Sequence, residues 1–187
     1  MDILGQVRRY GPLLVGAWKM ERRPTMPSVD IHPLLLWAKW SKGDSPTYHP
    51  LLCHLCDVAA VTLEMWVAVL SPWVRRSFAD DLGLSDEDTG RWLAYLSGLH
   101  DIGKASPTFQ LKVEASRLEL QAAGLPLRTK AGTVPHGTVS AVVLSKLLVE
   151  KHDLSGELAS KVATVVGGHH GVFPPPRSGR CAQRRCR

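Results

Sequence analysis

Six residues whose side chains commonly bind metal ions lie in or beside apolar, helix-like segments of this 187-residue chain. Imidazole nitrogens bind Zn, Mn, Fe, Co or Ni, and one carboxylate can bind two ions through its two oxygens. Two divalent ions about 3.5 to 4 Å apart can activate water and stabilise both oxygens of a displacement at phosphorus. The residue types therefore indicate one metal centre made from the following side chains: His54, His100, Asp101, His136, His169 and His170.

The stretch "LSGLHDIGKASPTF" adds two residues that suit such chemistry. Lys104 follows Asp101 by about one helical turn, so its ammonium could contact a non-bridging phosphate oxygen. Gly103 lacks a side chain and leaves room for backbone and substrate to approach closely. Asp101 and Lys104 are accordingly the candidate catalytic residues.

Each of these residues also has a purely structural interpretation. A buried histidine such as His54 is often a hydrogen-bonded core residue. His100-Asp101 can cap a helix, and His169-His170, which follow two glycines, can lie on a loop surface. These interpretations are independent of one another, whereas one metal centre accounts for all of the residues, and we therefore favour the metal centre.

The segments that carry these residues show helical periodicity. Apolar positions recur at helical spacing through "HPLLCHLCDVAAVTLEMWVAVL", and a second helix is predicted around Thr89 to His100, after the acidic "SDEDTG". A polar helix is predicted near Leu111 to Ala123, and two more in "HGTVSAVVLSKLLVEKH" and "SGELASKVATVVGGHHG". No strand alternation of useful length is present. The predicted fold is an all-α helical bundle with the metal site between helices.

Composition and length fit one globular domain, with 44% hydrophobic and 21% charged residues. The net charge of +6 favours a polyanionic partner, although part of it lies in the arginine-rich end of the chain. No apolar run approaches the roughly 18 to 20 residues of a membrane span, and no signal peptide is recognisable. We therefore expect a cytoplasmic protein without a membrane partner. Cys53 and Cys56, in an apolar helical pattern, are expected to pack in the core.

Four blocks in this order, "HPLLCHLCDVAAV", "LAYLSGLHDIGKASPTFQ", "PHGTVSA" and "GGHHGVFP", resemble the HD superfamily of metal-dependent phosphohydrolases. More specifically, they resemble the HD nuclease domain at the N-terminus of the CRISPR type I helicase–nuclease. "LLLWAKW" is similar to the opening helix of that subfamily. The resemblance covers most of the chain and implies an HD domain at 31–175 that is C-terminally truncated. Residues 1–30 are weakly patterned and are expected to form an N-terminal extension, and residues 176–187 lack a hydrophobic period and are expected to form a basic unstructured tail.

The resemblance also implies a function and the roles of individual residues. It implies a nuclease that cuts single-stranded DNA in antiviral defence, with the CRISPR surveillance complex and a helicase module, in cis or in trans, as partners. His54, His100 and Asp101 would bind a first divalent ion (Mn, Fe, Co, Ni or Zn, or Mg). Asp101 would bridge to a second ion. The remaining ligands of that second ion would be His136, His169 and His170. Lys104 would contact substrate phosphate. Asp57 has no ligand role in the family, but it lies three residues after His54 on the same helical face, so we expect it to orient His54.

The sequence departs from this family at its end. The family has another metal-binding aspartate well downstream of the double histidine, but no Asp or Glu follows His170 here. We therefore expect the first ion to have one carboxylate fewer. Two alternatives stay open beside the nuclease: an HD phosphohydrolase of nucleotides, and a truncated domain that binds without catalysis.

Overall fold

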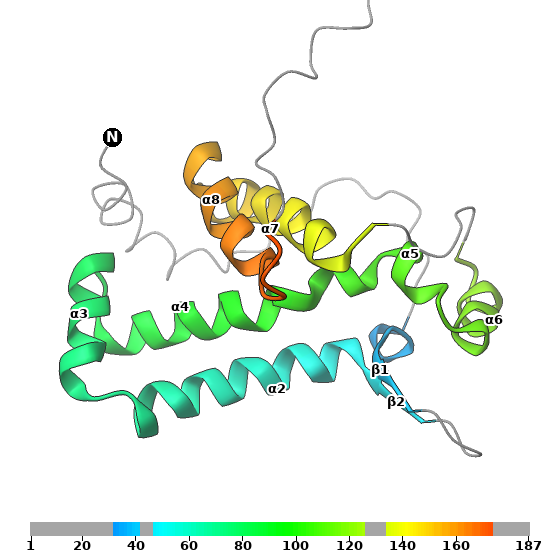
Figure 1. Ribbon diagram of the computed structural model, residues 1–187, viewed down its shortest axis with the longest axis horizontal. Helices are drawn as coiled ribbons and strands as arrows, with labels where there is room; N and C mark the ends of the chain where they lie inside the picture. The colour runs from blue at the N-terminus through cyan, green and yellow to red at the C-terminus, as the bar shows by residue number, and fades with distance from the viewer. Residues whose placement is uncertain (1–31, 42–46, 126–133, 174–187) are drawn as a thin grey trace, which may run out of the picture.

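Two long helices, α2 (Leu51–Glu64) and α4 (Asp86–Gly98), lie side by side and form one layer of the fold (Figure 1). The computed structural model describes residues 32–41, 47–125 and 134–173. Helix α2 (Leu51–Glu64) continues into a π-helical turn, η2 (Met65–Val69), and α3 (Pro72–Leu82) leads into α4 (Asp86–Gly98). The predicted extension at 1–30 and the predicted tail at 176–187 lie outside the described residues.

Capping residues explain where α3 and α4 begin and end. The Ser71 hydroxyl accepts a hydrogen bond from the Val74 N–H, and the following proline suits the first helical position. Gly83 ends α3 with a φ of 67°, which glycine adopts without strain. Ser85 caps α4 by accepting from the Asp88 N–H, and the first turn of α4 is acidic, as the helix dipole favours.

A second pair of helices, α7 (His136–His152) and α8 (Gly156–Gly167), packs on top of this layer (Figure 1). The main apolar core belongs to this pair, because its buried members come from α7, α8 and the turn between them. Trp92, Leu96 and Leu99 pack against that core from below. The buried members are Leu144, Leu148, Leu154, Leu158, Ala159 and Ala163.

Short elements connect the two layers. The 3-10 segment η3 (Leu99–Ala105) continues from α4 and lies against α7, and α5 (Pro107–Gln110) and α6 (Glu114–Ala122) follow. The prediction of an all-α fold is confirmed for the described residues, since helices dominate and the one sheet is a two-stranded ribbon. The predicted polar helix begins at Glu114, three residues later than expected.

The expectation of an opening helix in "LLLWAKW" is wrong. That stretch forms a short 3-10 turn, η1 (Pro33–Leu35), and then strand β1 (Trp37–Trp40), which pairs antiparallel with β2 (Tyr48–Pro50). The reason is tertiary: the buried Gln110 side chain takes both backbone groups of Trp37, accepting from its N–H at 3.2 Å and donating to its carbonyl at 2.9 Å. These hydrogen bonds hold the chain extended at Trp37. Because Gln110 is 73 residues away in the sequence, the local pattern of residues could not predict them.

Two expectations about the first long helix need correction: that no apolar run approaches the length of a membrane span, and that Cys53 and Cys56 pack in the core. Within the described residues, Leu51–Val69 is long and apolar enough to cross a membrane by length and composition, with a mean hydropathy of 1.6 and 11% of it buried. The same stretch contributes the buried His54 to the cluster described below. Cys56 is exposed and Cys53 half-buried, so the two thiols do not both pack in the core.

Candidate metal centre

Each predicted ligand lies where η3 approaches another element. His54 is on the buried face of α2, and His100 and Asp101 are in η3 itself. His136 is the first residue of α7, and His169-His170 directly follow α8. Residues separated by more than 100 positions in the sequence therefore meet at the junction of the two layers.

Asp101 is the centre of this cluster and is 3% exposed. Its Oδ2 atom lies 2.7 Å from Lys104 Nζ, 3.0 Å from His54 Nε2 and 3.2 Å from His100 Nε2. Its Oδ1 atom lies 3.1 Å from His136 Nε2 and 3.3 Å from His169 Nε2. The two oxygens of one carboxylate thus face two different sets of imidazoles.

The hydrogen bonds at the Nδ1 atoms of two imidazoles indicate that a cation belongs between their Nε2 atoms and Asp101. His100 Nδ1 donates to the Ser97 carbonyl at 2.8 Å, and His169 Nδ1 donates to the Val166 carbonyl at 3.1 Å. In the neutral form these two rings therefore direct an Nε2 lone pair at Asp101. A lone pair facing a carboxylate oxygen is repulsive unless a cation lies between them. Backbone carbonyls at Nδ1 are also the usual outer partners of metal-binding histidines.

The buried Oδ1 atom of Asp101 supports the same interpretation. It has no hydrogen-bond partner of acceptable geometry in the described part of the chain, although two Nε2 atoms are near. Atoms that share one ion at about 2.1 Å lie about 3.0 to 3.4 Å apart, depending on the coordination angle. The separations at Asp101 have this size, so the residues fit a metal centre.

The ligand atoms divide into two groups, in each of which all atoms lie within 4.8 Å of one another. His54, His100 and Asp101 form one, and His136, His169 and His170 form the other. His170 Nε2 lies 3.0 Å from His136 Nε2, so two nitrogens of the second group also face each other. Asp101 adjoins both groups through its two oxygens. This is the grouping that the family resemblance implies for two ions.

Burial and charge set the protonation of the cluster. Burial would raise the pKa of Asp101, but the His100 and Lys104 side chains beside its Oδ2 atom outweigh burial and hold that pKa below the usual range. Burial lowers the pKa of His136 to about 4, and it also lowers the pKa of His54 and of His169. A carboxylate anion at Asp101 and neutral imidazoles at His54, His136 and His169 are therefore favoured near neutral pH, and these are the forms that bind metal.

Close backbone contacts at glycines bring the elements together. A Cβ added at Gly103 would lie 2.1 Å from the His136 carbonyl and 2.5 Å from the Ser140 nitrogen. The space at Gly103 is therefore filled by α7, and the expectation that it leaves room for substrate is wrong. A Cβ at Gly137 would likewise lie 2.4 Å from the Gly167 carbonyl, so α7 and α8 also touch backbone to backbone.

Asp57 does not orient His54, contrary to expectation. Its Oδ2 atom lies 2.8 Å from His49 Nε2, whereas His54 Nε2 faces Asp101. Lys104 has a second contact that the sequence did not suggest, because its Nζ donates to the Ala38 carbonyl at 3.3 Å. Gln110, which joins the Trp37 backbone to the Lys104 carbonyl, was also missed. A buried glutamine has no sequence pattern of its own, so no signal predicted this role.

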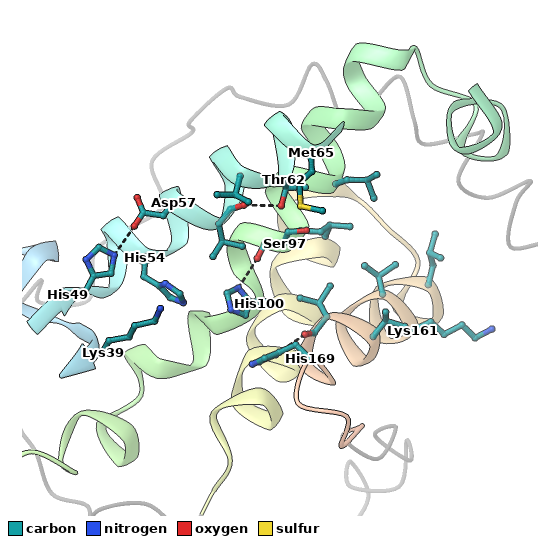
Figure 2. Close-up of a pocket in the computed structure, with 18 residues that line it drawn as sticks. Lys39, His49, His54, Asp57, Thr62, Met65, Ser97, His100, Lys161 and His169 are labelled. Atoms are coloured by element: carbon teal, nitrogen blue, oxygen red, sulfur yellow. Dashed lines mark hydrogen bonds and ion pairs between the residues drawn. The ribbon is translucent and has the colours of Figure 1, made fainter. Parts of the chain in front are cut away.

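A cavity of about 970 Å³ opens beside the first group of ligands. Lys39, His49, His54, His100 and His169 line one end of it (Figure 2). Apolar side chains of α2, α4 and α8 line the rest, among them Val58, Val61, Leu96, Val162 and Val166. The histidine cluster is therefore reached from a largely apolar cavity, and the polar end of this cavity carries Lys39 and Asp57 beside the histidines.

Comparison with known families decides the relationship of this chain. The sequence model of the family described as "Cas3, HD domain" matches residues 37–187. The chain belongs to the Cas3 HD-domain family. It is similar to the CRISPR-associated endonuclease/helicase Cas3 of Thermus thermophilus, with 40% identity over 148 residues that cover 79% of this chain and 16% of that protein.

Solved structures of Cas3 proteins share the fold. A crystal structure of a CRISPR-associated protein superposes with a TM-score of 0.72 and 47% identity, over 78% of this chain and 16% of the other. T. fusca Cas3 superposes with a TM-score of 0.69 and 31% identity, over 80% and 16%. The chain thus spans about one sixth of the length of the Cas3 proteins it matches.

Proposed function

We propose that this Cas3 HD domain is a metal-dependent phosphodiesterase that cuts single-stranded DNA in CRISPR defence. The observation that carries the proposal is the placement of Asp101, whose two oxygens face two separate sets of histidines. Membership of the Cas3 HD family supports the nuclease class. The choice of DNA strand, a cytoplasmic location and the partners, a surveillance complex and a helicase module, are parts of the same proposal.

The residues of the cluster have different roles in this proposal. His54, His100 and Asp101 would hold one divalent ion, and His136, His169 and His170 would hold a second one next to Asp101. When bound, divalent ions of Mn, Fe, Co, Ni, Zn or Mg would supply the Lewis acidity that hydrolysis of a phosphodiester needs. Lys104 holds Asp101 in place through its 2.7 Å contact. Because an ammonium has three protons and Asp101 and Ala38 take two, the third is available to a phosphate oxygen of the substrate.

Metal analysis and cleavage together test the proposal. The purified protein, loaded with Mn²⁺ and dialysed, is expected to hold about two ions per chain and to cut a labelled single-stranded oligonucleotide. Asp101→Ala should lose cleavage and most of the bound metal while its circular dichroism stays helical. A wild-type protein that binds no metal, or an Asp101→Ala variant with full cleavage, would contradict the proposal. The first of these results would support a domain that binds without catalysis.

A second candidate, hydrolysis of nucleotides, is favoured by one observation. The cavity of about 970 Å³ has the size of a small-molecule site. Release of phosphate from a panel of nucleoside monophosphates, measured beside cleavage of single-stranded and double-stranded DNA, separates the two candidates. A nuclease should act at least tenfold faster on the single strand than on any nucleotide, and the reverse order would favour the second candidate.

A further inference from the structure

We infer that Lys39 binds a backbone phosphate of the DNA strand that flanks the phosphate being cut, an inference that rests on the proposed nuclease function. Lys39 lines the polar end of the cavity together with His54, Asp57 and His100. Figure 2 shows its side chain extending toward the His54 ring. Its ammonium therefore lies on the cavity side of the first group of ligands.

The strand that carries Lys39 is tied directly to the metal centre. Lys104 Nζ contacts Asp101 Oδ2 at 2.7 Å and the carbonyl of Ala38, the residue before Lys39, at 3.3 Å. On the other side of Ala38, Gln110 holds both backbone groups of Trp37. An irregularity in strand register between Trp37 and Lys39 alters the direction of the chain at this point. The position of Lys39 is thus set relative to Asp101.

The Lys39 ammonium has no hydrogen bond or ion pair among the described residues, in contrast to Lys104. The two carboxylates of this region are engaged by other groups. Asp57 Oδ2 lies 2.8 Å from His49 Nε2, and His49 is the register partner of Lys39 across the ribbon. Asp101 is surrounded by Lys104 and four imidazoles. Lys39 is exposed, so its ammonium is hydrated and is available to an anion that enters the cavity beside the ligand cluster.

A strand of DNA supplies such an anion. The two groups of ligands would engage the phosphate being cut, and Lys39, which is displaced toward the cavity, is placed for the next phosphate along the strand. A contact of this kind positions the strand but does not take part in bond breaking. Its loss should therefore raise KM and leave kcat nearly unchanged.

The test compares Lys39→Gln with the wild-type full chain. Binding of a fluorescein-labelled dT10 is measured by anisotropy in EDTA over a series of salt concentrations, so that neither metal nor cleavage affects the readout. We expect roughly tenfold weaker binding, the usual size of one lost charge-assisted contact. The slope of log K against log salt is negative, and its magnitude should decrease by about 0.7, which corresponds to one phosphate of a single strand. Lys39→Arg should restore most of the affinity.

Lys146→Gln is the matched control, because it removes the same charge from α7 at a site that does not line the cavity. Equal weakening in both variants would reduce the effect to net charge and would overturn the inference, as would unchanged binding in Lys39→Gln. If Lys39→Gln weakened the binding of dTMP by the same factor as the binding of dT10, the assignment to a flanking phosphate would be overturned, because dTMP has only one phosphate. Since binding is measured without metal, a chain that binds DNA through Lys39 but does not cleave it contradicts only the proposed function.

Discussion

The Gly103 N–H donates a hydrogen bond to the Ser140 hydroxyl at 2.9 Å, and both residues are buried. This contact joins η3, which carries His100 and Asp101, to α7, which begins with His136. Because no side chain separates the two backbones, the carboxylate reaches imidazoles on both sides of the crossing. The two ligand groups therefore depend on a contact that itself contains no ligand.

Gly103→Ala should push η3 and α7 apart, since its Cβ would lie 2.1 Å from the His136 carbonyl. The backbone must shift to remove the overlap, and overpacking of this kind costs about 1–3 kcal/mol or more in the free energy of unfolding. Urea denaturation measures that loss, and metal content should fall with it. Gly156→Ala is the control, because nothing lies within 4 Å of its added Cβ. Equal stability of both variants would contradict the close contact.

Asp101→Asn should remove the charge that stabilises Lys104 and the ligand cluster. Loss of one partner of a buried ion pair costs about 3–5 kcal/mol. Because the pKa of Asp101 is lowered in the folded state, its stabilisation is present above the unfolded pKa and disappears as the pH falls through the folded pKa. The variant should therefore have a lower Tm at pH 7, and Mn²⁺ should raise the Tm of the wild type but not of Asp101→Asn. A metal-induced shift of equal size in both proteins would contradict the role of Asp101.

Gln110→Ala should loosen β1, because the Trp37 N–H and carbonyl lose their side-chain partners. Each buried backbone group left without a partner costs about 1–3 kcal/mol, so a substantial drop in unfolding free energy is expected. Hydrogen exchange at the Trp37 amide gives the local measurement. Gln121→Ala is the control, since that side chain makes one exposed hydrogen bond with Arg117. Unchanged exchange at Trp37 would show that Gln110 does not hold the strand.

His152 should make stability depend on pH through a site outside the metal centre. Its Nε2 forms a hydrogen bond of 3.0 Å with the Tyr95 hydroxyl, and burial lowers its pKa although nearby Asp153 opposes the shift. The unfolded chain therefore takes up the proton first as the pH falls. Stability is complete above the unfolded value near 6.5 and declines as the pH drops below it.

His152→Gln should flatten the decline in unfolding free energy between pH 7 and pH 5, measured by urea denaturation in EDTA. His54, His136 and His169 also have lowered pKa values, so some decline should remain in the variant. His49→Gln is the control outside the core. An identical pH profile in wild type and His152→Gln would contradict the assignment to His152.

The chemistry of the candidate site could be predicted from the sequence, whereas several contacts around it could not. Imidazole and carboxylate groups at the ends of apolar helices predict a metal centre, because helices that pack must bring their ends and inner faces together. The helices themselves follow from apolar periodicity and caps such as Ser71 and Ser85. Both kinds of signal are local, since each depends on residues within one or two turns.

The choice of partners was decided by tertiary structure. Helical spacing places Asp57 on the same face as His54, but His54 turns to Asp101, 47 residues away, and Asp57 turns to His49. The family resemblance likewise implies a helix at Trp37, where Gln110 instead holds an extended strand. Periodicity determines which face a side chain occupies, but which of several nearby polar groups it contacts depends on the packing of distant segments. That packing also places Lys39 beside His54 at one end of the cavity.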